Sequence, residues 1–348
     1  MEFLGYEIKG RMIAASCPAT ETLENILECE RNGASAAILK SASSVRLSDS
    51  GKRRCFLDNK NGLFWCESGF DREILPIAEA AALTRQAVKN RKHILIIPSI
   101  TEMSLNPDKW LADCRAFEQA GADAVQLDFF YFPNLMAENN FNERFISLLK
   151  TLSEKCRIPV MPKLSINIPA EYAVYAFKKA GIKYVSLLDS IKAPPPAGAD
   201  LSGNSLSAFG SFMFQLTRQY TYIMAKSGLQ VCAGGGVKNA ADASELLRLG
   251  ATTVQLATAV LLNGFKRFRE IGNAIKEPSS ACKSGYTGSR RIHFDSSRCI
   301  HCGKCQTQTF CTTVKQITSG KISAEYATCE GCGLCEQLCS AGAVQINA

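Results

Sequence analysis

Eight cysteines near the end of the chain constrain its structure more than any other feature. They form two runs, each with three cysteines spaced by two residues and a fourth farther on: Cys299, Cys302, Cys305, Cys311, then Cys329, Cys332, Cys335, Cys339. Such spacing suits three corners of an iron–sulfur cubane, and in two-cluster ferredoxins the fourth ligand comes from the other run. We therefore predict two [4Fe–4S] clusters. The expected ligand sets are Cys299, Cys302, Cys305 and Cys339 for one cluster, and Cys311, Cys329, Cys332 and Cys335 for the other.

Zinc is the alternative occupant, because paired C-x2-C units also bind it. The triple spacing with a distant fourth cysteine favours iron–sulfur clusters. Two details depart from the ferredoxin template. Five residues separate Cys305 from Cys311, and Ser340 stands where a proline usually follows the last cysteine.

The preceding 290 or so residues alternate between continuous apolar runs and segments with helical spacing. The apolar runs suit parallel strands that are buried on both faces; they cover residues 12–16, 36–40, 93–100, 124–130, 159–165, 184–188, 230–236 and 253–259. The helical segments include residues 21–31, 73–88, 108–119, 143–156, 170–179 and 241–249. Eight strands, each followed by a helix, predict an α/β fold of the (β/α)8 TIM-barrel type rather than an open sheet.

The domain boundary is expected near residue 280, with the barrel in residues 1–280 and a linker and two-cluster ferredoxin-like domain in residues 281–348. Residues 41–70 and 191–208 show no clear period and are expected to be loops. Both follow strands, so we place them on the carboxyl-terminal face of the barrel, where active sites of such barrels lie.

Composition and charge narrow the class of protein. No run of 18 apolar residues and no signal peptide are evident, and the scattered remaining cysteines suit reduced thiols, so we expect a cytoplasmic protein with no membrane segment. The formal charge of +8 counts the cluster cysteines as neutral thiols. Each cluster with four thiolates carries about −2, so the charge falls to roughly +4. Without a dense basic run, this disfavours a nucleic-acid partner.

Small residues follow the last two predicted strands. Gly234, Gly235 and Gly236 come after the seventh strand, and Ala257 and Thr258 come after the eighth. Glycines allow the backbone to approach a ligand closely, and these two loops form the common phosphate site of such barrels. A plain tight turn is the alternative reading of the glycine run.

Two lysines stand near the ends of other strands, Lys40 after the second and Lys163 near the end of the fifth. A solvated lysine is the ordinary interpretation of either one alone. Together, beside a phosphate site, they indicate a flavin, because a lysine stabilises the negative charge on the N1/O2 edge of a reduced flavin. A flavin also suits the clusters, since it can exchange single electrons with them.

The chain resembles the dihydroorotate dehydrogenase superfamily of FMN barrels. Within it, the chain is most similar to the C-terminal half of dihydropyrimidine dehydrogenase, an FMN barrel joined to a two-cluster ferredoxin domain. The matching segments are residues 14–20, 39–41, 59–63, 159–167, 210–211, 235–236 and 257–258. The resemblance implies one FMN, with contacts from Ala15, Ser16, Lys40, Ser41, Lys163, Gly210, Gly234, Gly235, Gly236, Ala257 and Thr258. It also implies that Asn106 lies on the substrate side.

Two departures from the family pattern concern the substrate. The family has Asn-Leu-Ser-Cys-Pro after the fourth strand, with Cys or Ser as acid/base, whereas this chain has Asp128-Phe129-Phe130-Tyr131-Phe132-Pro133. After the sixth strand, Asp189 and Ser190 replace an Asn-Thr pair. We expect Asp128, Asp189 and Ser190 to bind substrate. An ionised Asp only accepts hydrogen bonds, so these changes predict a substrate with N–H donors or positive charge.

The missing Cys or Ser leaves the proton donor open. Tyr131 and Asp128 are the catalytic candidates on this loop. The alternative is that the aromatic run from Phe129 to Phe132 only packs the cavity wall.

Three functions remain open. The first is an FMN and iron–sulfur oxidoreductase that acts on a CH–CH bond of a small, nitrogen-containing, dihydropyrimidine- or dihydroorotate-like molecule. The second is an electron-transfer subunit of a larger complex. The third is an enzyme similar to tRNA dihydrouridine synthases, which the absence of an RNA-binding extension disfavours. No Rossmann G-x-G-x-x-G fingerprint is present, so the expected electron partner is a separate ferredoxin or NAD(P)H-oxidising flavoprotein. A homo-oligomer is compatible with the sequence.

Overall fold

The computed structural model describes residues 1–44, 55–58, 63–67, 74–129, 136, 139–194, 196, 206–275, 291–308, 311–320, 329 and 332–347. The chain divides into two units, Met1–Glu277 and Pro278–Ala348, which are described separately. None of the described helices is long and apolar enough to cross a membrane.

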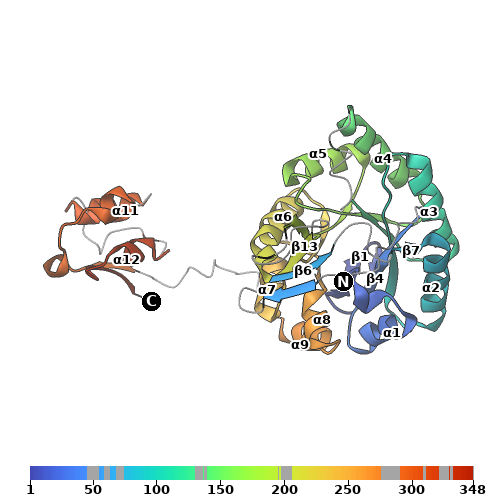
Figure 1. Cartoon of the computed structure of the whole chain (residues 1–348), viewed down its shortest axis with the longest axis horizontal. Helices are drawn as coiled ribbons and strands as arrows, with labels where there is room; N and C mark the ends of the chain where they lie inside the picture. Colours follow the sequence, from blue (N-terminus) through green and yellow to red (C-terminus); the bar gives the residue numbers. More distant parts are fainter. Residues whose placement is uncertain are drawn as a thin grey trace. The chain divides into compact units, whose positions relative to one another are not determined.

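The first unit is a closed barrel of eight parallel strands (Figure 1). The strands, in order around the barrel, are β3 (Met12–Ala14), β4 (Ala36–Ser43), β8 (Leu95–Ile100), β9 (Val125–Asp128), β10 (Val160–Lys163), β11 (Tyr184–Ser186), β14 (Gln230–Ala233) and β15 (Thr253–Leu256). Pairing of β3 with both β15 and β4 closes the ring. Each strand falls within or overlaps a run predicted from the sequence, and the TIM-barrel prediction is confirmed.

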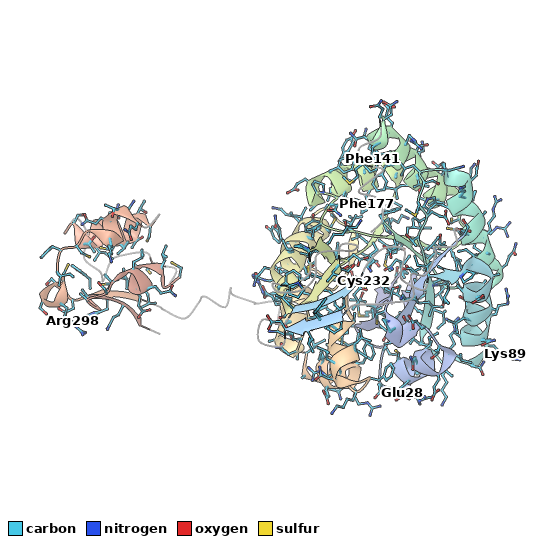
Figure 2. All side chains as sticks on the ribbon, in the orientation of Figure 1. Glu28, Lys89, Phe141, Phe177, Cys232 and Arg298 are labelled. Atoms are coloured by element: carbon cyan, nitrogen blue, oxygen red, sulfur yellow. The ribbon has the colours of Figure 1, made fainter. Side chains whose placement is uncertain are left out.

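Helices surround the strands, as Figure 1 shows. They are α1 (Leu23–Arg31), α2 (Ile77–Asn90), α3 (Pro107–Gln119), α4 (Phe141–Lys155), α5 (Ala170–Ala180), α6 (Phe214–Lys226), α7 (Ala240–Arg248), α8 (Thr258–Asn263) and α9 (Arg267–Ala274). Their inner faces are apolar, so the layer between helices and strands forms the main core. Figure 2 shows Cys232 inside the ring and Lys89 at its outer edge.

The amino-terminal end of the barrel is filled by apolar side chains. The short hairpin of β1 (Glu2–Phe3) and β2 (Tyr6–Glu7) places Phe3 and Leu4 there, both fully buried. They pack with residues inside the barrel, among them Ile38, Ile97 and Met161. Because this end is closed by packing, a ligand cavity is left to the opposite, carboxyl-terminal end.

A second, antiparallel sheet forms from segments that follow barrel strands. It joins β12 (Ile191–Ala193), β13 (Leu206–Gly210), β6 (Leu63–Glu67) and β5 (Cys55–Asp58) in that order. The expectation of a loop is therefore wrong for Ile191–Ala193, for residues 206–208 of β13 and for the strands within residues 41–70. These strands are short, and their main pairing joins β6 to β13, which are far apart in the chain. A local periodicity does not reveal such pairing. One further short strand, β7 (Leu75–Pro76), pairs with β4.

The second unit contains a two-stranded sheet and short helices in its described residues. Strand β16 (Arg291–Phe294) pairs antiparallel with β17 (Val344–Asn347). The helices are α10 (Lys304–Thr307), α11 (Thr312–Thr318) and α12 (Leu334–Leu338). Their buried core consists of Ile292, Val314, Ile317, Cys335 and Val344.

Candidate active site

A cavity of about 380 Å³ lies at the carboxyl-terminal end of the barrel strands. Residues that end or follow seven of the strands line it, and Phe64, Phe209 and Gly210 of the second sheet complete the wall. The volume is within the range of small-molecule sites, and the position is that of TIM-barrel active sites.

Most of the site residues predicted from the sequence meet in this cavity. They are Ala15, Ser16, Lys40, Ser41, Asp128, Lys163, Asp189, Ser190, Gly210, Gly235, Gly236, Ala257 and Thr258. Gly234 lies directly before the lining glycines, and its carbonyl accepts hydrogen bonds from Leu188 N at 2.7 Å and Thr217 Oγ1 at 3.0 Å. Tyr131 lies outside the described residues.

The structure does not bring Asn106 into the cavity lining. Asn106 is exposed and is the N-cap of α3, where its side chain accepts a hydrogen bond from Asp108 N at 3.0 Å. A side chain used to cap a helix satisfies an otherwise unpaired backbone N–H. Asn106 therefore does not lie among the cavity residues, where the family resemblance led us to expect it on the substrate side.

An irregularity in β4 directs two consecutive side chains toward the cavity. Successive residues of a regular strand point to opposite faces, but the pairing of β4 with β8 shifts register between Ile38 and Ser41. Lys40 and Ser41 consequently both line the cavity. Lys40 Nζ lies 3.1 Å from Glu21 Oε1, and the Lys40 side chain is only 12% exposed.

Lys163 and Asp189 form an ion pair at the cavity wall. Lys163 Nζ lies 2.9 Å from Asp189 Oδ2, and the side chains are 11% and 9% exposed. The other carboxylate oxygen, Oδ1, accepts a hydrogen bond from Ser190 N at 2.7 Å. This arrangement holds Asp189 in one orientation, with its charge balanced by the ammonium group of Lys163.

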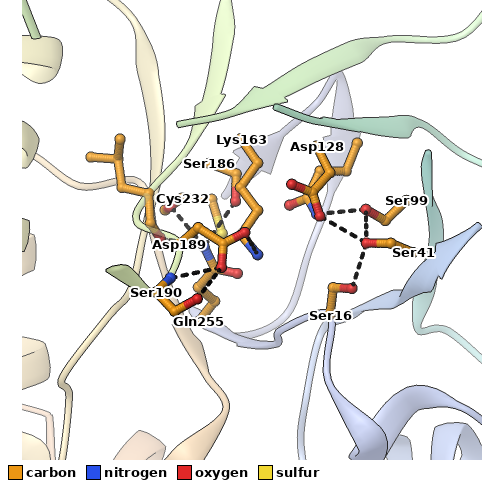
Figure 3. Close-up of polar contacts among 12 residues, drawn as sticks. Ser16, Ser41, Ser99, Asp128, Lys163, Ser186, Asp189, Ser190, Cys232 and Gln255 are labelled. Carbon is orange, nitrogen blue, oxygen red and sulfur yellow. Dashed lines mark hydrogen bonds and ion pairs between the residues drawn. The ribbon is translucent and has the colours of Figure 1, made fainter. Parts of the chain in front are cut away.

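Asp128 lies beside Lys163, because the two residues are register partners on β9 and β10. Ser41 Oγ donates a hydrogen bond to Asp128 Oδ2 at 2.8 Å (Figure 3). Ser41 Oγ also lies 3.1 Å from Ser99 Oγ and 3.4 Å from Ser16 Oγ. Three strands thus bring hydroxyl and carboxylate groups together at one side of the cavity.

The glycines after β14 leave space that a side chain would fill. Gly235 and Gly236 have φ of +101° and +88°, in the region that favours glycine. A Cβ on Gly236 would stand 2.6 Å from Phe214 N, and one on Gly235 would stand 2.8 Å from Thr217 Oγ1. The backbone here can approach a ligand only because both positions lack a side chain, which is the property that a phosphate cradle requires.

Several lining residues were not predicted from the sequence. Phe64 and Phe209 are cross-strand partners whose ring centroids lie 4.9 Å apart. Gln255 also lines the cavity, and its amide donates to Ser186 Oγ at 2.8 Å. Gln255 lies in the middle of an apolar strand, and this polar interruption was the available signal. The aromatic pair had none, because its strands are far apart in the chain.

Cys17 lines the cavity but has the properties of an ordinary buried thiol. Burial raises the pKa of Cys17 to about 11, and the positive charges of Lys40 and Lys163 offset only part of that rise. A thiol with such a pKa is almost entirely protonated at neutral pH and is a poor nucleophile.

In the second unit, the tail cysteines lie in two groups. Cys299, Cys302, Cys305 and Cys339 line one small cavity. Burial raises the pKa of Cys335 to about 11, with contributions from neighbouring Cys329, Cys311 and Cys332. Among the described residues, no three Cys, His, Asp or Glu side chains are arranged to hold a single metal ion. A cubane has a different requirement, because each of its thiolates binds a separate iron.

Comparison with known proteins gives a family and several distant relatives. The model of the dihydroorotate dehydrogenase family matches residues 1–278. The NAD-dependent dihydropyrimidine dehydrogenase subunit PreA of Escherichia coli (strain K12) is 22% identical over 275 residues, covering 66% of this chain and 65% of the relative. The catalytic subunit of dihydroorotate dehydrogenase B (NAD(+)) from Pyrococcus abyssi is 29% identical over 156 residues, covering 43% of this chain and 52% of the relative. The chain thus matches about two thirds of the length of the first relative and about half of the second.

Proposed function

The chain belongs to the dihydroorotate dehydrogenase family, and on that premise we propose that it is an FMN-dependent oxidoreductase acting on a CH–CH bond of a small, nitrogen-containing molecule. The observation that carries the proposal is that two largely covered lysines, two buried aspartates and a glycine cradle meet in one cavity. Cationic groups near the ring tune the electronics of a flavin, and a backbone cradle can bind its phosphate.

The described residues fit FMN. Gly235 and Gly236, together with Ala257 and Thr258, would hold the phosphate, because they present backbone groups to the cavity without crowding it. Lys163 would lie by the ring, where an ammonium group stabilises negative charge. When bound, FMN supplies the hydride acceptor or donor for the reaction.

The carboxylates of Asp128 and Asp189 define the chemistry of the substrate. Both line the cavity and both are more than nine-tenths buried. Ionised carboxylates accept hydrogen bonds and favour a ligand with N–H groups or positive charge. The names of the two relatives refer to dihydropyrimidine and dihydroorotate. We propose that this protein also acts on a nitrogen heterocycle, which differs from those two at the groups that meet Asp128 and Asp189.

Two [4Fe–4S] clusters in the second unit would carry electrons to or from FMN. The grouping of Cys299, Cys302, Cys305 and Cys339 around one cavity supports the first ligand set. Cys311, Cys329 and Cys332 lie near enough to Cys335 to contribute to its raised pKa, and this proximity supports the second ligand set. An external ferredoxin or NAD(P)H-oxidising flavoprotein would then be the partner; the names of the two relatives refer to NAD and to subunits.

The test uses the full chain, purified anaerobically. We expect one FMN and about eight irons per chain. After photoreduction of the flavin, uracil, thymine, orotate and related unsaturated heterocycles are added one at a time, and flavin absorbance reports reoxidation. Reoxidation by a member of this panel supports the proposal. A protein that contains FMN but is reoxidised only by a redox protein would be an electron-transfer subunit, and FAD or the absence of flavin would exclude the proposed chemistry.

A further inference from the structure

Removal of two hydrogens from a CH–CH bond leaves one proton to be transferred, besides the hydride. Ser41 and Asp128 are placed to transfer it. Both residues line the cavity, and they are only 8% and 4% exposed. Their hydrogen bond, 2.8 Å from Ser41 Oγ to Asp128 Oδ2, joins a hydroxyl to a carboxylate within the same wall.

The neighbouring groups determine which way the hydrogens point. Ser41 has one hydroxyl hydrogen, which it donates to Asp128, so Ser99 must be the donor in the 3.1 Å contact between Ser99 Oγ and Ser41 Oγ. Ser99 Oγ in turn accepts a hydrogen bond from Gln126 Nε2 at 2.9 Å. The hydrogen bonds therefore run in one direction, from Gln126 through Ser99 and Ser41 to Asp128. Such a chain polarises the Ser41 hydroxyl toward the carboxylate.

We propose that Ser41 transfers the proton between the substrate and Asp128; the inference rests on the proposed oxidoreductase function. In the oxidation direction, one C–H bond of the substrate would break and its hydrogen would leave as a hydride, for which bound FMN would supply the acceptor. The adjacent C–H bond gives its proton to Ser41 Oγ, and its electron pair forms the new C=C bond. The original hydroxyl proton of Ser41 moves to Asp128 Oδ2, which becomes a neutral carboxylic acid. Reduction reverses each transfer.

Charged groups on the neighbouring strands bear on this transfer. Lys163 is the register partner of Asp128, and Lys40 directly precedes Ser41. Asp189 lies across the cavity and is paired with Lys163. The protonation of Asp128 is therefore linked to the charges of these groups. For this reason, the experiment compares how the reaction rate depends on pH in the parent and in variants of the full chain.

The experiment follows two readouts in Ser41→Ala, Asp128→Asn and the parent. The first is the rate at which uracil, thymine or orotate reoxidises the photoreduced flavin, measured across pH. The second is exchange of C–H hydrogens for deuterium in 5,6-dihydrouracil and L-dihydroorotate, followed by proton NMR in D2O without net turnover. We expect Ser41→Ala to lower both rates by roughly 10²–10³-fold, the usual contribution of one positioned acid or base, with flavin content retained.

Two further variants separate chemistry from structure. Ser41→Thr keeps the hydroxyl and is expected to restore most of both rates. Ser43→Ala is the matched control, because Ser43 is a buried serine on the same strand that bonds a carboxylate, Glu102 Oε1 at 3.2 Å, outside the cavity lining. It should remain within about twofold of the parent. Asp128→Asn should lower the maximal rate and flatten the dependence of that rate on pH. If Asp128 only bound the substrate, the same variant would change only the substrate concentration that gives half of the maximal rate.

The outcomes are distinguishable. Parent-like rates in Ser41→Ala, together with a large loss in Tyr131→Phe, would overturn the relay and assign the proton to the tyrosine predicted from the sequence. Equal losses in Ser41→Ala and Ser43→Ala would show a merely structural effect and also overturn it. If no member of the panel reoxidises the parent, the proposed function fails and the relay fails with it.

Discussion

The barrel and the second unit differ in what their cores contain. In the barrel, large side chains such as Trp110, Phe117 and Phe145 are fully buried, and a continuous apolar layer separates strands from helices. In the described part of the second unit, the buried core consists of Ile292, Val314, Ile317, Cys335 and Val344, against which four more of the tail cysteines pack. Small domains with little apolar burial usually depend on disulfides or metals for stability.

This difference predicts that the two units depend on bound groups to different degrees for their stability. The barrel is stabilised by its own packing, so it can present a preformed cavity to FMN. The described residues of the second unit bury little apolar surface around the cysteines, so we expect its fold to depend on what those cysteines bind. The predictions below test this contrast, beginning with the largest expected effect.

Removal of iron should unfold the second unit and leave the barrel folded. After anaerobic chelation of the full chain, we expect amide protons of α11 and β17 to lose protection by roughly 10³-fold, because local opening there should approach the unfolded state. Amides of β8 and β9 should keep theirs. Hydrogen exchange with mass spectrometry measures both in one sample. Intact protection of α11 without iron would show that the second unit does not depend on bound iron for its fold. Stoichiometric zinc in the native protein would contradict the cluster assignment.

Gly236→Ala should damage the barrel site without affecting the iron content. Gly236 has a φ of +88°, and a Cβ there would meet Phe214 N at 2.6 Å. Strain of this kind costs about 1–3 kcal/mol, so we expect FMN affinity to fall about 5- to 150-fold or more, as measured by fluorescence titration. Gly33→Ala is the matched control, because Gly33 also has positive φ, +92°, but open space around it. Equal loss of FMN in both variants would mean that the cradle geometry has no special role.

Lys163→Ala should change the flavin but not the clusters. Loss of the ammonium group 2.9 Å from Asp189 removes positive charge from the cavity wall and leaves a buried carboxylate without this partner. We expect the flavin reduction potential to fall by an amount on the order of 30 mV, equal to about 1.4 kcal/mol for a two-electron couple. Anaerobic potentiometry measures it, with cluster signals in the same titration as the internal control. An unaltered flavin potential would argue against a place for Lys163 beside the ring.

The smallest effect concerns the pH dependence of barrel stability. Burial, assisted by a hydrogen bond to Glu102, raises the pKa of Asp113 on α3 to about 7. The folded state thus binds a proton that the unfolded state releases above pH 4 or so, and the stability of the parent should fall as pH rises from about 4 to about 7. Asp113→Asn removes this proton linkage, so the melting temperature of the variant relative to the parent should increase as the pH rises over that interval. Scanning calorimetry at pH 5 and pH 8 checks the sign, and a constant difference between the two proteins would refute the linkage.

Much of the site could be predicted from the sequence because parallel strands bring their carboxyl ends to one place. Residues at the ends of the eight apolar runs, such as Lys163, Asp189 and Gly236, are therefore expected to lie close together. The aromatic wall could not be predicted in this way. Phe64 and Phe209 meet through pairing of β6 with β13, which only the folded chain establishes.

The sequence by itself determined the barrel and the two runs of tail cysteines, because both depend on local spacing: continuous apolar runs in one case and pairs of intervening residues in the other. The tertiary structure alone decided which side chains face one another across the cavity. The register shift in β4 turned Ser41 and Lys40 toward the same space, and strand closure then placed Ser41 against Asp128. It also placed Asn106 at a helix cap rather than in the cavity. Orientation of this kind depends on register and on contacts between distant segments, which no local pattern encodes.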